Sequence, residues 1–159
     1  MKLKGLRGVI VMNHKEKAVD YYNNNFNCSQ GVFTAFATEM GMDEKLALKI
    51  ATNFGGGERK GELCGAVAGA LMVLGLRCGH CDSEDAEGKA KAYAVSTEFM
   101  NRFIEQNGSV VCRELLGYDL TKKEDMSIIQ EQKLFRTFCP RMVESAAQIL
   151  DEMISDGIC

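Results

Sequence analysis

The chain has 159 residues, a formal net charge of −3 and a hydrophobic share of 46%, which suits one soluble globular domain. Nothing in this charge balance points to nucleic acid or an anionic membrane, so we expect neither as a partner. Seven cysteines are too few for a disulfide-rich secreted scaffold, and their number is odd. Because no secretory signal is visible, we expect a cytoplasmic protein, in which clustered cysteines indicate metal or redox chemistry.

Residues 1–12 show no periodicity and predict a loose tail, within which Met12 is an alternative start to Met1. Residues 13–159 are expected to form a single domain that contains all the cysteines. Apolar residues recur there at three- and four-residue steps, and no alternating pattern of useful length appears. We therefore expect an all-α fold, a compact helical bundle.

The first helices are expected before a glycine-rich interruption of the chain. An amphipathic stretch begins near residue 15, and Asn27 is a favoured N-cap for a second helix in which Cys28 shares the apolar face. A third helix is expected after Asp43, with Leu46 and Ile50 directed inward.

Residues 61–76 are expected to form a buried central helix. A fourteen-residue stretch within it carries no charge, a length that is short for a membrane span. Gly61, Gly65 and Gly69 repeat at four-residue spacing, although glycine costs about 1 kcal/mol relative to alanine inside a helix. The close approach of a neighbouring helix or of a ligand to the bare backbone would compensate for this cost. Gly57, in the loop before the helix, would let the backbone pass close to the same place.

Further helices are expected in the second half of the chain. A long helix covers about residues 83–106, and a short one lies around residues 110–116. Thr121 and Glu124 have the spacing of a capping box for the next segment. The last helix covers about residues 140–155 and has a continuous apolar stripe.

Four cysteines fall in the first turn of four different expected helices: Cys28, Cys64, Cys112 and Cys139. Gly61 would cap a helix with Cys64 at its third position, and Ser109 stands in the same relation to Cys112. Cys139 directly precedes Pro140, a residue favoured at the first helical position. Because helix N-termini offer free N–H groups and the positive end of the helix dipole, they favour a thiolate over a thiol. The pattern indicates a site that collects negatively charged sulfur.

Four thiolates at one end of a bundle would suit a [2Fe–2S] cluster, whose negative charge the helix N-termini would partly offset. Basic residues near three of the cysteines in sequence would add to this field: Arg59, Lys60, Arg113 and Arg141. The wide spacing of the cysteines differs from the tight pairs of zinc fingers and does not identify a ligand. Alternatively, the four are small apolar residues that fill the core.

The residues around these cysteines have a recognisable order. Cys64-Gly65-Ala66-x-x-Gly69 follows Gly55-Gly56-Gly57, Asn27-Cys28-Ser29-Gln30 precedes it, and Cys112-Arg113-Glu114-Leu115-Leu116-Gly117 and Cys139-Pro140 come after it. Over about residues 15–153 the chain resembles the C_GCAxxG_C_C family of redox-active proteins. The resemblance implies a small all-helical protein with four defining cysteines, also found as the cluster-binding part of split-Soret cytochromes. There the four cysteines are taken to hold an iron–sulfur cluster.

Cys78 and Cys81 lie outside this pattern, in the tetrapeptide Cys-Gly-His-Cys of protein disulfide isomerases. The fold of those enzymes needs strands and a facing cis-proline, whereas the only proline here is Pro140. Four roles stay open for the pair: zinc binding with His80, a local disulfide, electron relay to the main site, or an exposed turn without function. We expect no functional role for Cys159.

The sequence thus predicts an electron-transfer or redox-sensing protein that holds an iron–sulfur cluster or another redox metal, with an unidentified redox partner. Two alternatives stay open: a thiol–disulfide oxidoreductase, and a binding or scaffold protein with structural zinc or an empty cysteine site. The residues do not define an enzymatic reaction. No membrane span is expected, and the glycine stripe would also suit a homodimer.

Overall fold

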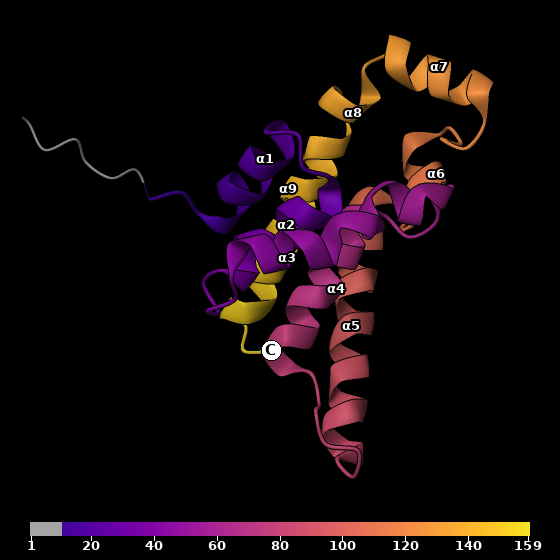
Figure 1. Cartoon of the computed structure of the whole chain (residues 1–159). Helices are drawn as coiled ribbons and strands as arrows, with labels where there is room; N and C mark the ends of the chain where they lie inside the picture. Colours follow the sequence, from indigo (N-terminus) through magenta and orange to yellow (C-terminus); the bar gives the residue numbers. More distant parts are fainter. Residues whose placement is uncertain (1–10) are drawn as a thin grey trace, which may run out of the picture.

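Helices make up the fold of residues 11–159, the part of the chain that this computed structural model describes (Figure 1). Most of the expected loose tail, residues 1–10, lies outside the described residues. Val11 and Met12 form no helix, and both are exposed. None of the helices among the described residues combines the length and the apolar character that crossing a membrane requires.

The helices follow one another along the chain as α1 (His14–Asn23), α2 (Cys28–Ala37), α3 (Glu44–Ala51), α4 (Gly65–Cys78), α5 (Ala86–Asn107), α6 (Cys112–Leu116), α7 (Lys123–Glu131), α8 (Leu134–Thr137) and α9 (Cys139–Ser155). Two short turns, η1 (Thr52–Phe54) and η2 (Gly57–Gly61), lead from α3 to α4. Pairing of the β type within the described residues is limited to one isolated bridge between Leu63 and Val111. The prediction of an all-α fold is confirmed.

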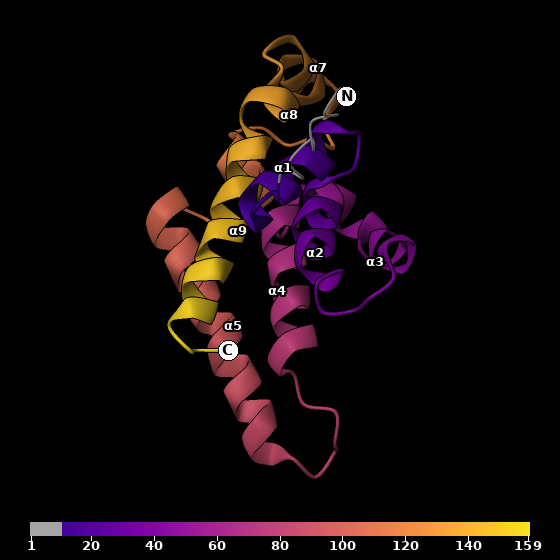
Figure 2. The ribbon, with the colours of Figure 1, turned by 90° about the vertical axis from the view of Figure 1, so that its left-hand side faces the viewer.

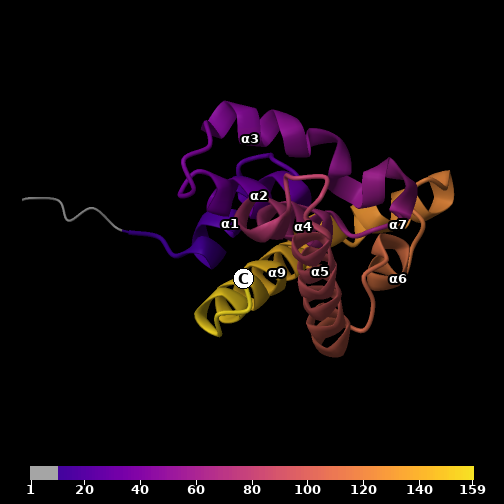
Figure 3. The same ribbon diagram turned by 90° about the horizontal axis from the view of Figure 1, so that it is seen from below.

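The core lies where α2 and α4 pack against each other, with α1 and α3 against α2, α5 against α4, and α9 against both (Figures 1 and 2). Seen from below, α5 and α9 lie on the other side of α4 from α3 (Figure 3). The largest fully buried side chains include Phe99 and Phe103 of α5 and Ile149 and Leu150 of α9. A single apolar cluster therefore links the two halves of the chain.

Glycines of α4 allow its close contact with α2. A Cβ atom at Gly69 would lie 2.7 Å from the carbonyl oxygen of Ser29 and 3.2 Å from the backbone nitrogen of Phe33. A Cβ at Gly65 would lie 3.1 Å from the Cβ of Cys28. The backbone of α2 thus occupies the space beside Gly69, whereas a Cβ at Gly65 would also lie 3.0 Å from the Phe54 carbonyl oxygen. These close contacts offset the low helix propensity of glycine.

The predicted central helix over residues 61–76 is displaced along the chain. Gly61 has a positive φ of 69° and ends the turn η2, so α4 begins only at Gly65, with Cys64 as its N-cap. The first half of α4 is buried, but Leu76 is 42% exposed near its end. Burial on all sides therefore applies only to the half of α4 that adjoins α2.

Two other local predictions are wrong. Leu46 and Ile50 are 50% and 44% exposed, because α3 turns its alanines toward α2. Thr121 does not cap α7: its hydroxyl donates to Asp119 Oδ1, and the helix begins at Lys123 after an uncapped Lys122. In α3 the packing against α2 overrides the sequence pattern. At Thr121 a tight local turn does so.

Candidate functional site

One cavity of about 210 Å³ is lined by all four cysteines of the sequence pattern, Cys28, Cys64, Cys112 and Cys139. They come from the starts of α2, α4, α6 and α9. Three of the side chains are buried, and that of Cys28 is half-buried. A cavity needs only about 10–15 Å³ to hold one water molecule, so this one has room for a considerably larger group.

Cys28 is positioned by a capping box at the start of α2. The Asn27 side-chain oxygen accepts the Gln30 backbone N–H at 3.0 Å, and the Gln30 side chain accepts the Asn27 N–H at 3.0 Å. The remaining amide groups of both side chains donate to the carbonyl oxygens of Thr52 and Leu48. The predicted cap at Asn27 is confirmed, and it also fastens this helix start to α3.

Cys64 and Cys112 are positioned by backbone pairing between the segments in front of them. The Cys64 N–H donates to the Val110 carbonyl at 2.7 Å, and the Cys112 N–H donates to the Glu62 carbonyl at 2.5 Å. The predicted third helical positions are therefore wrong: Cys64 is an N-cap, and Cys112 is the first residue of α6. Ser109 caps no helix, since its hydroxyl oxygen accepts the Val111 N–H within a turn.

The glycine-rich loop passes against this pair of cysteines. Gly57 has a φ of 61°, and a Cβ atom there would lie 3.0 Å from the Cβ of Cys112. Glu58 and Arg59 also have positive φ values, 53° and 61°, although they carry side chains. Such backbone conformations cost on the order of 1–3 kcal/mol each and are concentrated at functional sites. A Cβ at Gly57 would also clash with the Glu62 backbone nitrogen, so both the closure of the loop and the neighbouring Cys112 require glycine here. A Cβ at Gly61 would lie 3.4 Å from the Cβ of Arg113, so this glycine is not at the cavity itself.

The thiols of Cys64 and Cys112 are held in their neutral form. Burial raises the pKa of Cys64 to about 11, although the backbone N–H groups of Ala66 and Val67 at the start of α4 act in the opposite direction. Burial and the neighbouring Cys64 and Cys139 raise the pKa of Cys112 to about 12. The predicted preference of helix starts for thiolate is present at Cys64, but desolvation outweighs it.

Cys28 and Cys139 are direct neighbours whose pKa values shift in opposite directions. The contact with Cys139, followed by burial, places the pKa of Cys28 well above its usual range. The same contact lowers the pKa of Cys139. The Tyr22 side chain also contacts Cys139, while its hydroxyl donates to the Phe135 carbonyl at 2.6 Å. The two shifts have opposite signs because the proton on one sulfur stabilises negative charge on the other.

Apolar and aromatic side chains form most of the remaining lining: Tyr22, Phe26, Leu115, Leu116, Phe135, Phe138 and Met142. The sequence pattern placed none of these at the site, because a residue on the apolar face of a helix has the same signature whether it lines a core or a cavity. Of the four basic residues expected nearby, Arg59 lines the cavity. Arg113 pairs with Glu62, and Arg141 lies over the Phe138 ring.

The donor set is four thiols, which is the set that iron–sulfur clusters use. The described residues contain no group of three or more His, Cys, Asp or Glu side chains close enough to hold a single metal ion. The four sulfurs thus share a cavity without meeting at one point.

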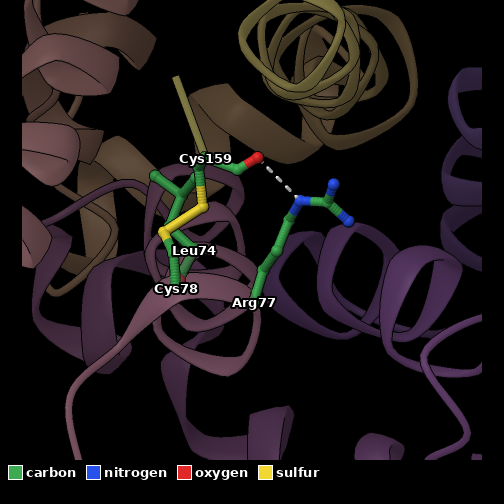
Figure 4. Close-up of a disulfide and its surroundings, with 4 residues drawn as sticks. All are labelled: Leu74, Arg77, Cys78 and Cys159. Atoms are coloured by element: carbon green, nitrogen blue, oxygen red, sulfur yellow. Dashed lines mark hydrogen bonds between the residues drawn. A yellow bond between two sulfur atoms is a disulfide. The ribbon is translucent and has the colours of Figure 1, made fainter. Parts of the chain in front are cut away.

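The other cysteines lie at the opposite end of α4. Cys78, the last residue of that helix, forms a disulfide with Cys159, which follows α9 (Figure 4). Cys81 is a free, exposed thiol. The local Cys78–Cys81 disulfide considered from the sequence is therefore not the one formed, and Cys159, for which we expected no role, supplies the partner. No sequence signal identified this pairing, since the two residues are 81 positions apart.

Comparison with known proteins gives one family match. Residues 26–153 match the family model described as "Putative redox-active protein (C_GCAxxG_C_C)". No curated protein and no solved structure matches the chain significantly. The matched range contains all four cysteines of the cavity. Because the match covers most of the chain, the protein belongs to the C_GCAxxG_C_C family of redox-active proteins.

Proposed function

We propose that the protein is an electron-transfer or redox-sensing module in which an iron–sulfur cluster of the [2Fe–2S] type is held by Cys28, Cys64, Cys112 and Cys139. The observation that carries this proposal is that cysteines from four separate helix starts line one cavity. A cluster held by four thiolates supplies reversible transfer of single electrons. The family description supports a redox role.

A cluster and a single zinc ion make different demands on the four cysteines. Structural zinc needs four ligands around one point, with sulfurs about 2.3 Å from the metal. The described residues contain no group arranged in that way. A [2Fe–2S] cluster divides its four cysteines between two irons, so the sulfurs need not meet at one point.

The surrounding residues have roles that suit such a site. The N–H groups of Ala66 and Val67 point to the Cys64 sulfur, and hydrogen bonds to a ligand sulfur raise a reduction potential. Phe135, Phe138 and Met142 give the cavity an apolar wall. Arg59 adds a positive charge at the rim, which favours negatively charged sulfur at Cys112.

Iron and sulfide analysis of protein purified without oxygen tests the proposal. We expect about two irons and two acid-labile sulfides per chain, with a coloured protein. Cys64→Ser should lose most of the iron, whereas Cys81→Ser, which changes an exposed thiol at the other end of α4, should keep it. A colourless protein that takes up no iron during anaerobic reconstitution would contradict the proposal. Stoichiometric zinc that depends on Cys64 would favour a structural site instead.

The contact between Cys28 and Cys139 favours a second candidate function, thiol–disulfide exchange in the same cavity. The two thiols would give two electrons and two protons to a disulfide substrate, which leaves as a dithiol while a Cys28–Cys139 disulfide forms. Iron-free protein incubated with oxidised glutathione would then contain this disulfide. Its absence from a peptide map would exclude this candidate.

A further inference from the structure

Cys78 and Cys159 meet at the end of α4 that is remote from the cavity, and Cys81 lies in the connection that follows this end. Cys64 precedes α4, and Cys78 is its last residue. Fourteen helical residues span about 20 Å, at roughly 1.5 Å per residue. Cys78 is bonded to Cys159, and Cys81 follows three residues later along the chain. This group cannot exchange sulfur bonds directly with the cavity, so its chemistry must be its own.

We propose that Cys78, Cys81 and Cys159 form a second redox site, which carries out thiol–disulfide exchange. The Cys81 thiolate attacks Cys78 Sγ, the Cys78–Cys159 bond breaks, and a Cys78–Cys81 bond forms. Cys159 leaves as a thiolate and takes up a proton from water, which balances the proton that Cys81 lost. The step exchanges one disulfide for another, so it consumes no oxidant and no reductant.

The exposure of the three sulfurs supports this order of events. Cys81 is free and exposed, whereas Cys78 and Cys159 are half-buried and pack against the main apolar cluster. A thiol from solution therefore reaches the existing disulfide less easily than a thiol attached three residues away. The Gly79 N–H closes α4 by donating to the Gly75 carbonyl, and residues 79–82 form no helix. A glycine directly after Cys78 allows this exposed connection to turn back toward it.

Contacts other than the disulfide keep Cys159 near the end of α4. The Arg77 Nε–H donates to the Cys159 carbonyl oxygen at 3.1 Å, as Figure 4 shows. The Ile158 N–H donates to the Met153 carbonyl at 3.0 Å, and the Ile158 side chain packs against the apolar cluster. The released Cys159 thiolate would thus stay within reach of Cys78, which makes the exchange reversible.

The co-reactant that this site would take is a dithiol. After exchange, the disulfide between Cys78 and Cys81 lies in the exposed connection between α4 and α5. An external dithiol can attack it there and become a disulfide itself, while the two protein thiols receive two electrons and two protons. The half-buried Cys78–Cys159 disulfide would be reduced through its exposed Cys78–Cys81 isomer.

Tryptic peptides separate the two disulfide isomers. Cys78 and Cys81 share the peptide 78–89, because no lysine or arginine lies between them, and Cys159 lies in the peptide 142–159. Full-length protein purified without reductant is incubated with about 0.1 mM glutathione, alkylated, digested and analysed by mass spectrometry. We expect part of the cross-linked peptide pair to convert to an internal disulfide in 78–89, with Cys159 alkylated.

Variants identify the attacking thiol. An attached thiol has an effective concentration of about 1 mM, so Cys159 should be released about tenfold faster in the wild type than in Cys81→Ser at about 0.1 mM glutathione. Ser83→Ala, a change in the same connection, should release Cys159 at the wild-type rate. Equal rates in the wild type and Cys81→Ser, or a cross-link that never leaves the pair 78–89 and 142–159, would overturn the proposal.

A further variant tests whether the short disulfide can close. Cys159→Ser treated with oxidised glutathione should form the internal Cys78–Cys81 disulfide. Glutathione adducts on both cysteines without this bond would also overturn the proposal. None of these measurements involves iron, so their outcome is independent of the proposed cluster at the cavity.

Discussion

At Cys64, two effects of opposite sign act on one sulfur. The N–H groups at the start of α4 stabilise the thiolate, and burial of a side chain that is only 5% exposed stabilises the thiol. Burial is the larger effect, and the pKa rises from the usual 9.0 to about 11. A metal or cluster that supplies positive charge would reverse this balance, which is why the same position suits both a neutral thiol and a ligand.

The raised pKa of Cys64 predicts that iron-free protein loses stability in alkali. The folded state holds this proton more tightly than the unfolded state, so the contribution is complete below pH 9 and is lost as pH rises through about 11. Two pKa units correspond to about 2–3 kcal/mol. Urea unfolding of the wild type and Cys64→Ala at about pH 8 and pH 10.5 measures this difference. The variant should show the shallower loss, and equal losses in both proteins would contradict the argument.

His14 joins three helices through one ring. Its Nδ1 lies 2.6 Å from Asp151 Oδ1 of α9, and its Nε2 lies 2.7 Å from Glu39 Oε2, just beyond α2. The ring also stacks on Phe36, with the ring centroids 4.0 Å apart. We expect His14→Ala to lower the free energy of unfolding by about 2 kcal/mol, since it removes two polar contacts and an aromatic stack.

Urea denaturation of His14→Ala measures this loss. Lys15→Ala provides the matched control on the next residue, because Lys15 makes only a half-exposed pair with Glu144 at 3.4 Å. Exposed ion pairs contribute about 0–1 kcal/mol, so this control should change stability little. A His14→Ala effect as small as that of the control would show that the ring does not hold the helices together.

At the scale of elements, the contact between α2 and α4 depends on where a glycine lies along α4. Gly69 faces the backbone of α2, but Gly75 has no atom within 4 Å of the place where a Cβ would lie. Gly69→Ala should destabilise by about 1–3 kcal/mol, since the new methyl group forces the two backbones apart. Gly75→Ala should stabilise by about 0.5–1 kcal/mol, because alanine is the better helix former. Urea unfolding should therefore give opposite signs for the two variants, and a stabilising Gly69→Ala would refute the close packing.

Helix starts show which features the sequence can predict. The cap at Asn27 and the start of α2 follow from residues within one turn, and the structure has them as expected. The starts of α4 and α6 differ, since backbone pairing of Leu63 with Val111 decides them. These residues are far apart in the sequence, and neither lies in a strand pattern. Long-range contacts of this kind leave no periodic signal.

The sequence also predicts only in part which apolar side chains are buried. In α3, Ala47 and Ala51 are fully buried while the larger Leu46 and Ile50 are exposed. A hydrophobic pattern identifies the apolar residues of a helix, but the neighbouring helix determines which of them are covered. Tyr93, an apolar-face residue of the long helix α5, is likewise 61% exposed.

At the scale of the whole molecule, α4 and α9 run side by side in the same direction. Both begin at the cavity, where Cys64 and Cys139 lie, and both end near the disulfide of Cys78 with Cys159. Their lengths of 14 and 17 residues are similar, so one pair of helices brings cysteines together at both ends. The sequence predicted the four cysteines as one set from their local positions. It could not predict the disulfide, because that bond depends on α9 packing parallel to α4.

The disulfide should contribute strongly to the stability of the whole chain. It links residues 81 positions apart, and closing a loop of that length in the unfolded state corresponds to at most about 4–5 kcal/mol in the chain-entropy description. We expect a reducing agent to lower the unfolding free energy of the wild type by about 3–4 kcal/mol in urea titrations. Cys159→Ser should match the reduced wild type and show no response to the reducing agent.

The two disulfide isomers of the proposed exchange should differ in stability. A Cys78–Cys81 disulfide closes a loop of only a few residues, so it constrains the unfolded chain far less than the long-range bond does. Protein converted to the short isomer should therefore unfold at nearly the same urea concentration as Cys159→Ser. If that protein retained the stability of the Cys78–Cys159 form, the long-range disulfide would contribute little, and packing of α9 against α4 would have to account for the stability instead.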